Sequence, residues 1–335
     1  MAKKKIEITK KLEDLAREGT LDSGIAILNL PSANYCEKRA ERIYVGGKLQ
    51  QSCFGCVTQG IKSEDYLGIR QIRDVIDFFA EQYGTRFITI NGRGDPFNLS
   101  LKEDNLEKIR YAHEQHGIQA YVFTAGNNLD EITCQTLVNS EANIMISLFG
   151  NWFIDADFFS GKEYPTAPKP LQNQAEIAGN LRRLIRTYRE HQNQPEEETT
   201  RIGMNYVVSW RDLSDGGAKV RALKQEANDN GIFFVVNTNF QKHPDDETQR
   251  LFEQFAHEYS DFHLRHSTAV NGQCQMGAGS SATIDFDGML LRCPYMDTKE
   301  GDGRFQDLFP ERIKEVLGRY MRDRSYPCVM RKHQK

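Results

Sequence analysis

Short apolar runs alternate with longer helical patterns along most of this 335-residue chain, and this alternation constrains the fold more than any other sequence feature. Six runs have strand length: residues 24–30, 86–91, 118–124, 144–149, 202–208 and 232–236. The stretches between them carry apolar residues at helical spacing, as in the expected helix 63–82. Parallel strands joined by right-handed helical crossovers close into a full or partial barrel. The sequence therefore predicts an α/β fold, a partial (β/α)6 TIM-like barrel.

An open, doubly wound sheet would give the same alternation of strands and helices. Its ligand site, however, usually centres on one glycine-rich turn. In this chain, unusual loops follow several early strands instead, which favours the barrel.

Three cysteines follow the first expected strand with the spacing C-x16-C-x2-C, namely Cys36, Cys53 and Cys56. Thiolates bind both iron–sulfur clusters and zinc. Zinc favours four ligands, and no second C-x2-C pair stands nearby. A 4Fe–4S cluster on three thiolates keeps one iron open, and that iron can bind a small molecule. The spacing therefore favours a cluster. Within the 16 residues between Cys36 and Cys53, Gly46-Gly47 predicts a turn.

Composition limits the classes of function. The formal net charge is −4, which disfavours nucleic acid as a partner, although both ends are locally basic. No apolar run approaches the length of a membrane span, and the lysine-rich start lacks the apolar segment of a signal peptide. We expect a cytoplasmic protein with no membrane partner, whose seven cysteines stay reduced.

A second cysteine set, Cys274, Cys293 and Cys328, lies beyond the last expected strand. Residues 282–292 alternate around Asp287-Gly288, which predicts a β-hairpin, and an amphipathic helix follows it. We expect this small β-hairpin plus helix to form a C-terminal extension. The expected division is an N-terminal extension at 1–23, the barrel at 24–260 and the C-terminal extension at 261–335.

Taken together, these features resemble the radical S-adenosylmethionine (radical SAM) superfamily. The resemblance assigns Cys36, Cys53 and Cys56 to the cluster that binds S-adenosylmethionine. It further implies that the cofactor is bound by the segment Gly92, Arg93, Gly94 and Asp95, which follows the second strand, and by two single residues, Ser147 and Asn205. Two departures stand out: the long first spacing, where C-x3-C-x2-C is usual, and Arg93-Gly94-Asp95 in place of Gly-Gly-Glu.

The C-x13-G-x4-C pattern from Cys274 to Cys293 resembles the SPASM and twitch extensions of the same superfamily. It implies a second, auxiliary 4Fe–4S cluster on Cys274, Cys293 and Cys328. The ligand of the fourth iron of this auxiliary cluster is unassigned: it is either a substrate atom or His333.

The resemblance implies an enzyme of oxidoreductase type. It would cleave S-adenosylmethionine reductively to a 5′-deoxyadenosyl radical and take hydrogen from a peptide or small metabolite. An electron donor such as flavodoxin or ferredoxin is implied as a partner. Two alternatives remain: modification of a nucleoside or tRNA, and a non-catalytic protein that binds an iron–sulfur cluster or zinc.

Overall fold

The structure is a computed structural model that describes residues 25–32, 42–45, 48–51, 66–91, 94–148, 169–191, 201–208, 210–238, 246–261, 269–270, 273–274, 279–296 and 298–323. Six parallel strands form its centre: β1 (Ile27–Pro31), β4 (Phe87–Asn91), β5 (Gln119–Thr124), β6 (Asn143–Leu148), β7 (Ile202–Val208) and β8 (Phe233–Thr238). These strands coincide with the six predicted runs to within three residues at either end.

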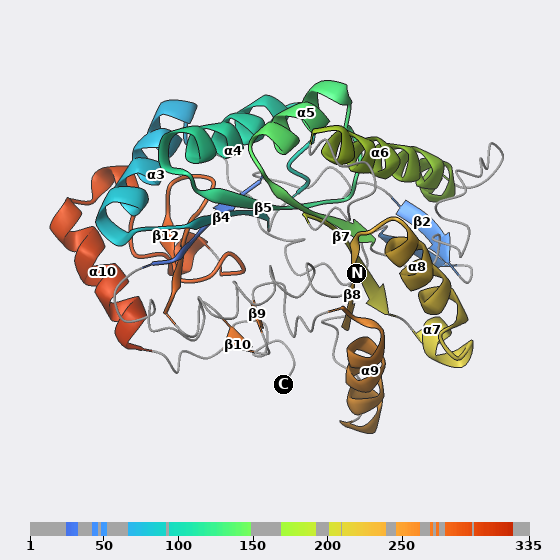
Figure 1. Cartoon of the computed structure of the whole chain (residues 1–335). Coiled ribbons are helices and arrows are strands. Elements are labelled where there is room, and N and C mark those ends of the chain that lie inside the picture. Colours follow the sequence, from blue (N-terminus) through green and yellow to red (C-terminus); the bar gives the residue numbers. More distant parts are fainter. Residues whose placement is uncertain are drawn as a thin grey trace.

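Helices follow the strands along the chain. They are α3 (Ile69–Tyr83), α4 (Lys102–His116), α5 (Glu131–Asn139), α6 (Lys169–His191), α7 (Trp210–Ser214), α8 (Ala218–Asp229), α9 (Asp246–Tyr259) and α10 (Pro310–Arg322). In Figure 1 the helices α3 to α6 follow the outer side of the curved sheet, with α10 beyond α3 and with α7 to α9 at the other end.

The sheet is an open arc. Its order is β12-β11-β1-β4-β5-β6-β7-β8, which confirms the partial barrel. The free edge of β8 is partly capped: the Phe234 N–H donates to the Asp261 carboxylate at 2.7 Å, and the Val236 N–H donates to the Ser260 hydroxyl at 2.8 Å. Such capping protects an edge strand from pairing with another chain.

The C-terminal hairpin extends the same sheet. Strand β11 (Ser281–Ile284) pairs in parallel with β1, and β12 (Leu290–Leu291) returns antiparallel to β11. Helix α10 buries Ile313, Val316 and Leu317. The predicted hairpin and helix are therefore present, although the alternation of residues 282–292 did not indicate that β11 would join β1.

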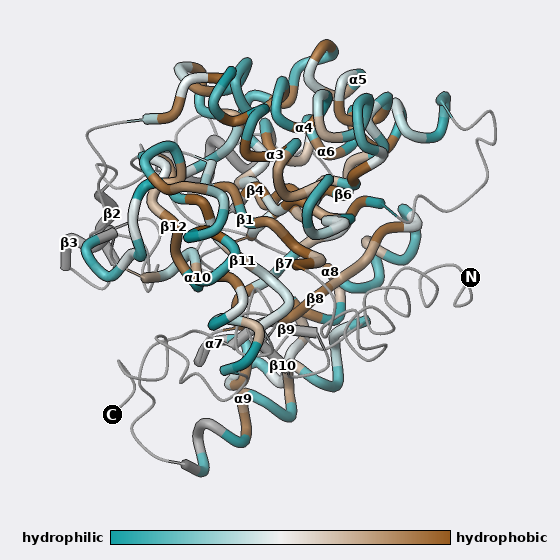
Figure 2. The backbone as a smooth tube through the Cα atoms, turned by 90° about the vertical axis from the view of Figure 1, so that its left-hand side faces the viewer, coloured by the Kyte–Doolittle hydropathy of each residue, from teal (hydrophilic) through white to brown (hydrophobic). Residues whose placement is uncertain are grey.

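The core lies between the sheet and the helices. Strand residues that point outward, such as Leu28, Ile88 and Ile146, are fully buried and pack in one cluster with Ile76 of α3 and Leu184 of α6. Figure 2 shows the apolar colours concentrated on the strands and the polar colours on the outer helices. Apolar burial of this kind holds parallel sheets together, because helices cover one whole face.

Two details of the expected helices were wrong. The helix predicted over 63–82 begins only at Ile69, because the Leu67 N–H donates to the Phe286 carbonyl of the hairpin turn instead of entering a helix. Ser100 with Glu103 three residues later has the pattern of a capping box, which predicts Ser100 as the cap of this helix, but the N-cap residue of α4 is Leu101. The Ser100 hydroxyl donates to Asn98 Oδ1 at 3.0 Å, a local turn that competes with capping.

Two short hairpins complete the described structure. Strands β2 (Arg42–Val45) and β3 (Lys48–Gln51) are antiparallel, and Val45 pairs with Lys48, so the pairing leaves Gly46-Gly47 between them, where a turn was predicted. Strands β9 (Ala269–Val270) and β10 (Gln273–Cys274) pair likewise. Within the described residues, no helix combines the length and the apolar character that a bilayer crossing requires.

Candidate functional site

The predicted cofactor-binding residues that the structure describes lie toward one edge of the sheet. Gly94 and Asp95 follow β4, whereas Ser147 and Asn205 are register partners on the adjacent strands β6 and β7. The carboxyl ends of parallel strands share an edge, and in barrels this edge carries the chemistry. Asn205 is 8% exposed and Ser147 is half-buried.

Asp95 holds the turn after β4 against the end of β5. Its carboxylate accepts hydrogen bonds from the Phe97 N–H at 2.9 Å, the Ala125 N–H at 2.5 Å and the Thr124 hydroxyl at 3.0 Å. A carboxylate with several N–H and O–H donors fixes the backbone around it. The side chain of Asp95 therefore positions two neighbouring loops of the candidate site.

Residues at the start of the cysteine loop contact the same turn. Ser32 directly follows β1, and its hydroxyl donates to the Gly94 carbonyl at 3.3 Å. The buried Asn105 of α4 donates from Nδ2 to the Ser32 carbonyl at 2.8 Å and to the Pro96 carbonyl at 2.9 Å. One amide thus ties the exit of β1 to the segment after β4.

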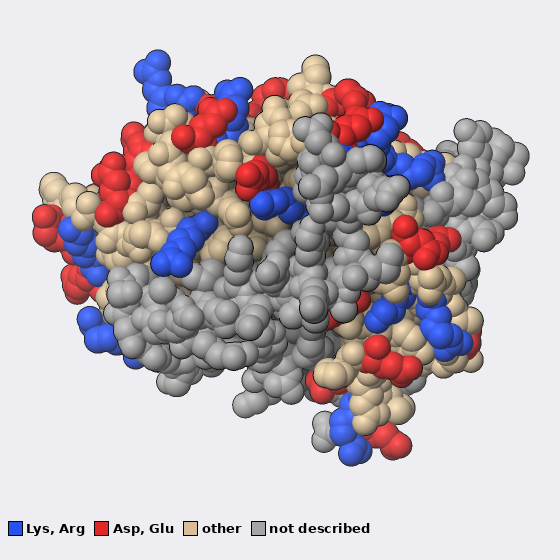
Figure 3. Space-filling model, in the orientation of Figure 1, with Lys and Arg blue, Asp and Glu red and all other residues tan. Residues whose placement is uncertain are grey.

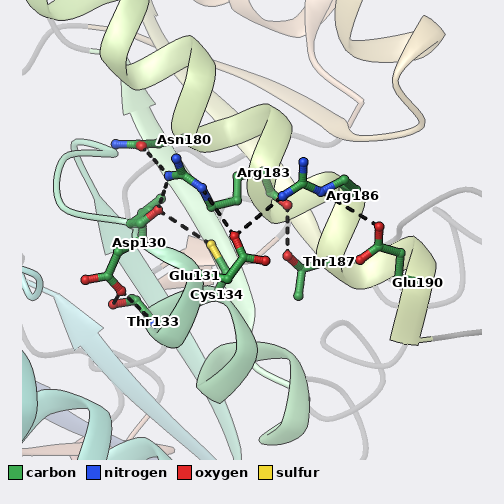
Figure 4. Close-up of polar contacts among 10 residues, drawn as sticks. Asp130, Glu131, Thr133, Cys134, Asn180, Arg183, Arg186, Thr187 and Glu190 are labelled. Carbon is green, nitrogen blue, oxygen red and sulfur yellow. Dashed lines mark hydrogen bonds and ion pairs between the residues drawn. The ribbon is translucent and has the colours of Figure 1, made fainter.

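The turn after β5 is held from α6. The Asn180 amide donates to the Gly126 carbonyl at 2.9 Å, and Arg183 Nη1 donates to the Leu129 carbonyl at 2.7 Å. Figure 4 shows the two side chains together on α6, where Arg183 Nη1 also donates to Asn180 Oδ1 at 2.8 Å. Gly126 has φ +86°, and a Cβ there would lie 2.9 Å from Cγ2 of Ile177. The close approach of α6 therefore requires glycine at this position.

Helix α5 begins beside this turn. Its N-cap residue Asp130 accepts the Thr133 N–H at 2.9 Å and also pairs with Lys102 of α4. Burial opposes the charged form of Asp130, but the hydrogen bonds from Lys102 and Thr133 outweigh it and lower its pKa to about 2. Cys134, in the same helix, is fully buried, and burial raises the pKa of its thiol to about 12. A thiol that is buried and protonated in this way packs as a small apolar side chain.

The concave face of the sheet carries a row of polar side chains. Thr89 donates to Asn29 Oδ1 at 2.6 Å, and Asn29 Nδ2 donates to the Ala282 carbonyl at 3.0 Å. Ala282 belongs to the outer core cluster, so Ser281 and Thr283 face the concave side. Both of these hydroxyls are buried and lack a hydrogen-bond partner.

Solved structures of other proteins share this architecture. SuiB from Streptococcus suis, solved with its precursor peptide SuiA, superposes with a TM-score of 0.56 at 12% identity, covering 97% of this chain and 71% of SuiB. The protein anSMEcpe with bound AdoMet (S-adenosylmethionine) gives a TM-score of 0.55 at 12% identity, covering 86% of this chain and 80% of anSMEcpe. Both are radical SAM enzymes.

This chain has the radical SAM fold. No protein-family model matches the chain, and no curated protein matches it in sequence. At 12% sequence identity, the structural similarity to these two proteins supports a shared fold only.

Within the radical SAM fold, most predicted metal ligands lie outside the described residues. This applies to Cys36, Cys53, Cys56 and Cys328, and also to Gly92 and Arg93. Cys274 ends β10, and only its backbone is described. The cysteine ligands and the cofactor-binding roles therefore remain predictions.

Cys293 is the predicted ligand whose side chain the structure describes. It follows β12, is 8% exposed and packs in a small apolar cluster with Leu291 and Met296. Leu291 is the register partner of Thr283, so this cluster lies beside the two unpaired hydroxyls. The hairpin thus brings Cys293 next to the polar row of the concave face.

Sequence reasoning missed several residues of this edge, including Asn29, Asn105 and Asn180. Asn29 carried a detectable signal, since it is a polar residue inside the apolar run Ile-Leu-Asn-Leu. Asn105 and Asn180 carried none, because asparagine on a helix is usually a surface residue.

Proposed function

We propose that this protein is a radical SAM enzyme that cleaves S-adenosylmethionine reductively and takes a hydrogen atom from a peptide or small metabolite. The observation that carries this proposal is the junction at Ser32. There the loop with the C-x16-C-x2-C spacing leaves β1, and the Ser32 hydroxyl binds the Gly94 carbonyl of the segment expected to meet the cofactor.

The residues present fit the cofactor. Gly94 has φ +66° and no side chain, so its backbone is open to close approach. The Ser147 hydroxyl and the Asn205 amide are adjacent in register and offer donors and acceptors to a polar ligand. Cys36, Cys53 and Cys56 would hold a 4Fe–4S cluster, which supplies the electron that cleaves S-adenosylmethionine.

This chain's own residues have three tasks. Asp95 and Asn105 hold the loops after β1, β4 and β5 in one arrangement. The concave side of the sheet would shield a reactive radical from water. Ser281 and Thr283 would hydrogen-bond a substrate there.

Two finer proposals complete this function. Cys274, Cys293 and Cys328 would hold an auxiliary 4Fe–4S cluster that accepts an electron, which makes the net reaction an oxidation, with flavodoxin or ferredoxin as the electron donor. The likeness to SuiB, which was solved with a precursor peptide, supports a peptide as substrate.

The test uses anaerobically reconstituted full-length protein. We expect about eight irons per chain, as two 4Fe–4S clusters carry, together with 5′-deoxyadenosine and methionine after addition of dithionite and S-adenosylmethionine. Cys53→Ala should lose about half of the iron and all 5′-deoxyadenosine. Cys293→Ala should lose the auxiliary cluster but keep cofactor cleavage.

Cys134→Ala is the matched control, because this thiol is fully buried, donates to the Leu129 carbonyl and belongs to neither predicted cysteine set. It should keep the iron and the product of the unmodified protein. Bound zinc, or iron without cleavage of S-adenosylmethionine, would instead support a non-catalytic metal protein and refute the proposal.

A further inference from the structure

Two buried hydroxyl groups on strand β11 make no hydrogen bond. Ser281 and Thr283 are fully buried, and within the part of the chain that the structure describes neither Oγ atom has a donor or an acceptor in reach. Burial takes the hydrogen bonds to water away from a hydroxyl, and without a replacement this destabilises the folded protein. An orphaned hydroxyl in a native core therefore indicates a partner that is bound there.

The sheet register shows what lies on either side of Ser281. On β1 its register partner is Ile27, whose side chain has no polar atom. On the other side, Thr283 pairs with Leu291 of β12 in the antiparallel ladder. Continuing this register by two residues along each strand places Ser281 opposite Cys293, just past the end of β12. Residues opposite each other in an antiparallel pair have their Cβ atoms about 4.5–5.5 Å apart.

Cys293 also belongs to the same face of the sheet as Ser281. Leu290 packs into the outer core cluster, whereas Leu291 and Cys293 belong to the small apolar cluster on the opposite, concave face. Cys293 is 8% exposed. The hydroxyl and the thiol therefore share an enclosed and largely apolar part of the concave face, where a hydrogen bond to a charged group is stronger than in water.

The missing acceptor is not the thiol of Cys293 by itself. The hydroxyl of Ser281 has no hydrogen-bond partner among the described residues, and Cys293 is one of them. A group held by Cys293 would supply the acceptor instead. The auxiliary 4Fe–4S cluster proposed above is such a group, because its sulfurs accept hydrogen bonds. An orphaned donor opposite a predicted cysteine ligand therefore fits a cluster at this position.

We propose that the Ser281 hydroxyl donates a hydrogen bond to a sulfur of the auxiliary cluster and thereby raises the reduction potential of that cluster. This inference rests on the proposed function, because it requires the auxiliary cluster on Cys293. Reduction adds one negative charge to the cluster, so a hydrogen bond donated to sulfur stabilises the reduced form more than the oxidised form. A higher potential makes the cluster a better acceptor for the electron of a substrate radical. The oxygen of Ser281 keeps its acceptor positions for a substrate.

Thr283 provides an internal comparison on the same strand. Its hydroxyl is equally buried and equally without a partner, but it lies opposite Leu291 and beside Asn29. The amide of Asn29 is part of the concave polar row, in which it accepts from Thr89. The hydroxyl of Thr283 therefore stays with the polar row and its proposed role toward the substrate, and the cluster is left to Ser281.

The experiment is a redox titration of the auxiliary cluster, followed by EPR, in full-length and anaerobically reconstituted protein. The Cys53→Ala background removes the cluster that binds S-adenosylmethionine, so that the signal comes from the auxiliary cluster. Adding Ser281→Ala should lower the midpoint potential by about 59 mV, which is a tenfold change in a one-electron equilibrium. Adding Thr283→Val should leave the potential unchanged when no substrate is present. Both variants should keep their iron and their stability, because neither hydroxyl has a hydrogen bond to lose among the described residues.

A second readout detects the hydrogen bond itself. ENDOR spectra of the reduced cluster in H₂O and in D₂O should show an exchangeable proton coupled to the cluster, which Ser281→Ala loses and Thr283→Val keeps. An unchanged potential and an unchanged proton signal in Ser281→Ala would overturn the hydrogen bond but not the cluster. Equal shifts in potential in the two variants would overturn its assignment to Ser281. A Cys53→Ala protein without any cluster would overturn the auxiliary cluster and this inference together, whereas cleavage of S-adenosylmethionine by the unmodified protein tests the radical function separately.

Discussion

Substituting Gly126 tests how closely α6 holds the turn after β5. An alanine at φ +86° would adopt a left-handed conformation, which costs about 1–2 kcal/mol. Its Cβ would also meet Ile177 Cγ2 at 2.9 Å and Ile146 Cγ2 at 3.3 Å. Both are methyl groups on branched side chains that cannot swing away, and overpacking of this kind costs about 1–3 kcal/mol. Gly126→Ala should therefore lower the free energy of unfolding by about 2–5 kcal/mol.

Urea unfolding of the full-length protein measures this loss, with Gly216→Ala as the matched control. Gly216 also has a positive φ, +64°, but a Cβ there would meet nothing within 4 Å. The control should lose only the backbone term, about 1–2 kcal/mol. In a double-mutant cycle, Ile177→Ala should cost less in the Gly126→Ala background than in the unmodified protein, because it removes the overpacked methyl group. Equal losses in the two glycine variants, or no coupling in the cycle, would refute the close contact with α6.

Three further predictions concern the same edge of the sheet. Asp95→Asn should destabilise the protein by about 2–3 kcal/mol in urea unfolding and abolish S-adenosylmethionine binding, because the amide nitrogen would face the Ala125 N–H with a donor. The control Thr124→Val removes one hydrogen bond and should cost only about 1 kcal/mol, so equal losses in the two variants would contradict this account. Asp130→Asn keeps the cap of α5 but loses the charge that pairs with Lys102. Because the pKa of Asp130 is lowered to about 2, the urea midpoint of the wild type should exceed that of the variant by a constant amount above about pH 5, and this difference should disappear as the pH falls from about 4 to 2. A difference that grows in acid would contradict the lowered pKa of Asp130. Thr283→Val should leave the free energy of unfolding unchanged or raise it, because the Thr283 hydroxyl is buried without a hydrogen-bond partner. The variant should turn over substrate more slowly but cleave S-adenosylmethionine at the same rate when no substrate is present. A loss of stability would mean that the hydroxyl has a hydrogen-bond partner.

Charged side chains of both signs lie close together on the described surface. Figure 3 shows basic and acidic side chains intermixed over the described part of one face. The pairs Arg73–Glu107, Arg201–Glu141 and Arg312–Glu315 show how closely the two signs alternate.

Sequence reasoning did not foresee the contacts that the side chains of Asp95 and Ser100 make. Asp95 was named as a cofactor-binding residue through the resemblance, and that role stays a prediction; its carboxylate accepts hydrogen bonds from Thr124 and Ala125. Ser100 has the sequence signature of a helix cap, yet Asn98 takes its hydroxyl. In both cases a nearby acceptor or donor, invisible in a periodic pattern, decided the outcome.

The sequence by itself determined the six parallel strands, the helices between them and the hairpin around Asp287-Gly288, because strand length, helical spacing and turn residues are local properties. Only the tertiary structure decided that β11 pairs with β1, a contact marked by the hydrogen bond from Asn29 to Ala282 across 253 positions of the chain. It likewise decided that Lys108 is buried beside Phe286. Such pairings depend on how distant segments fill shared space, and no local pattern of residues records that space.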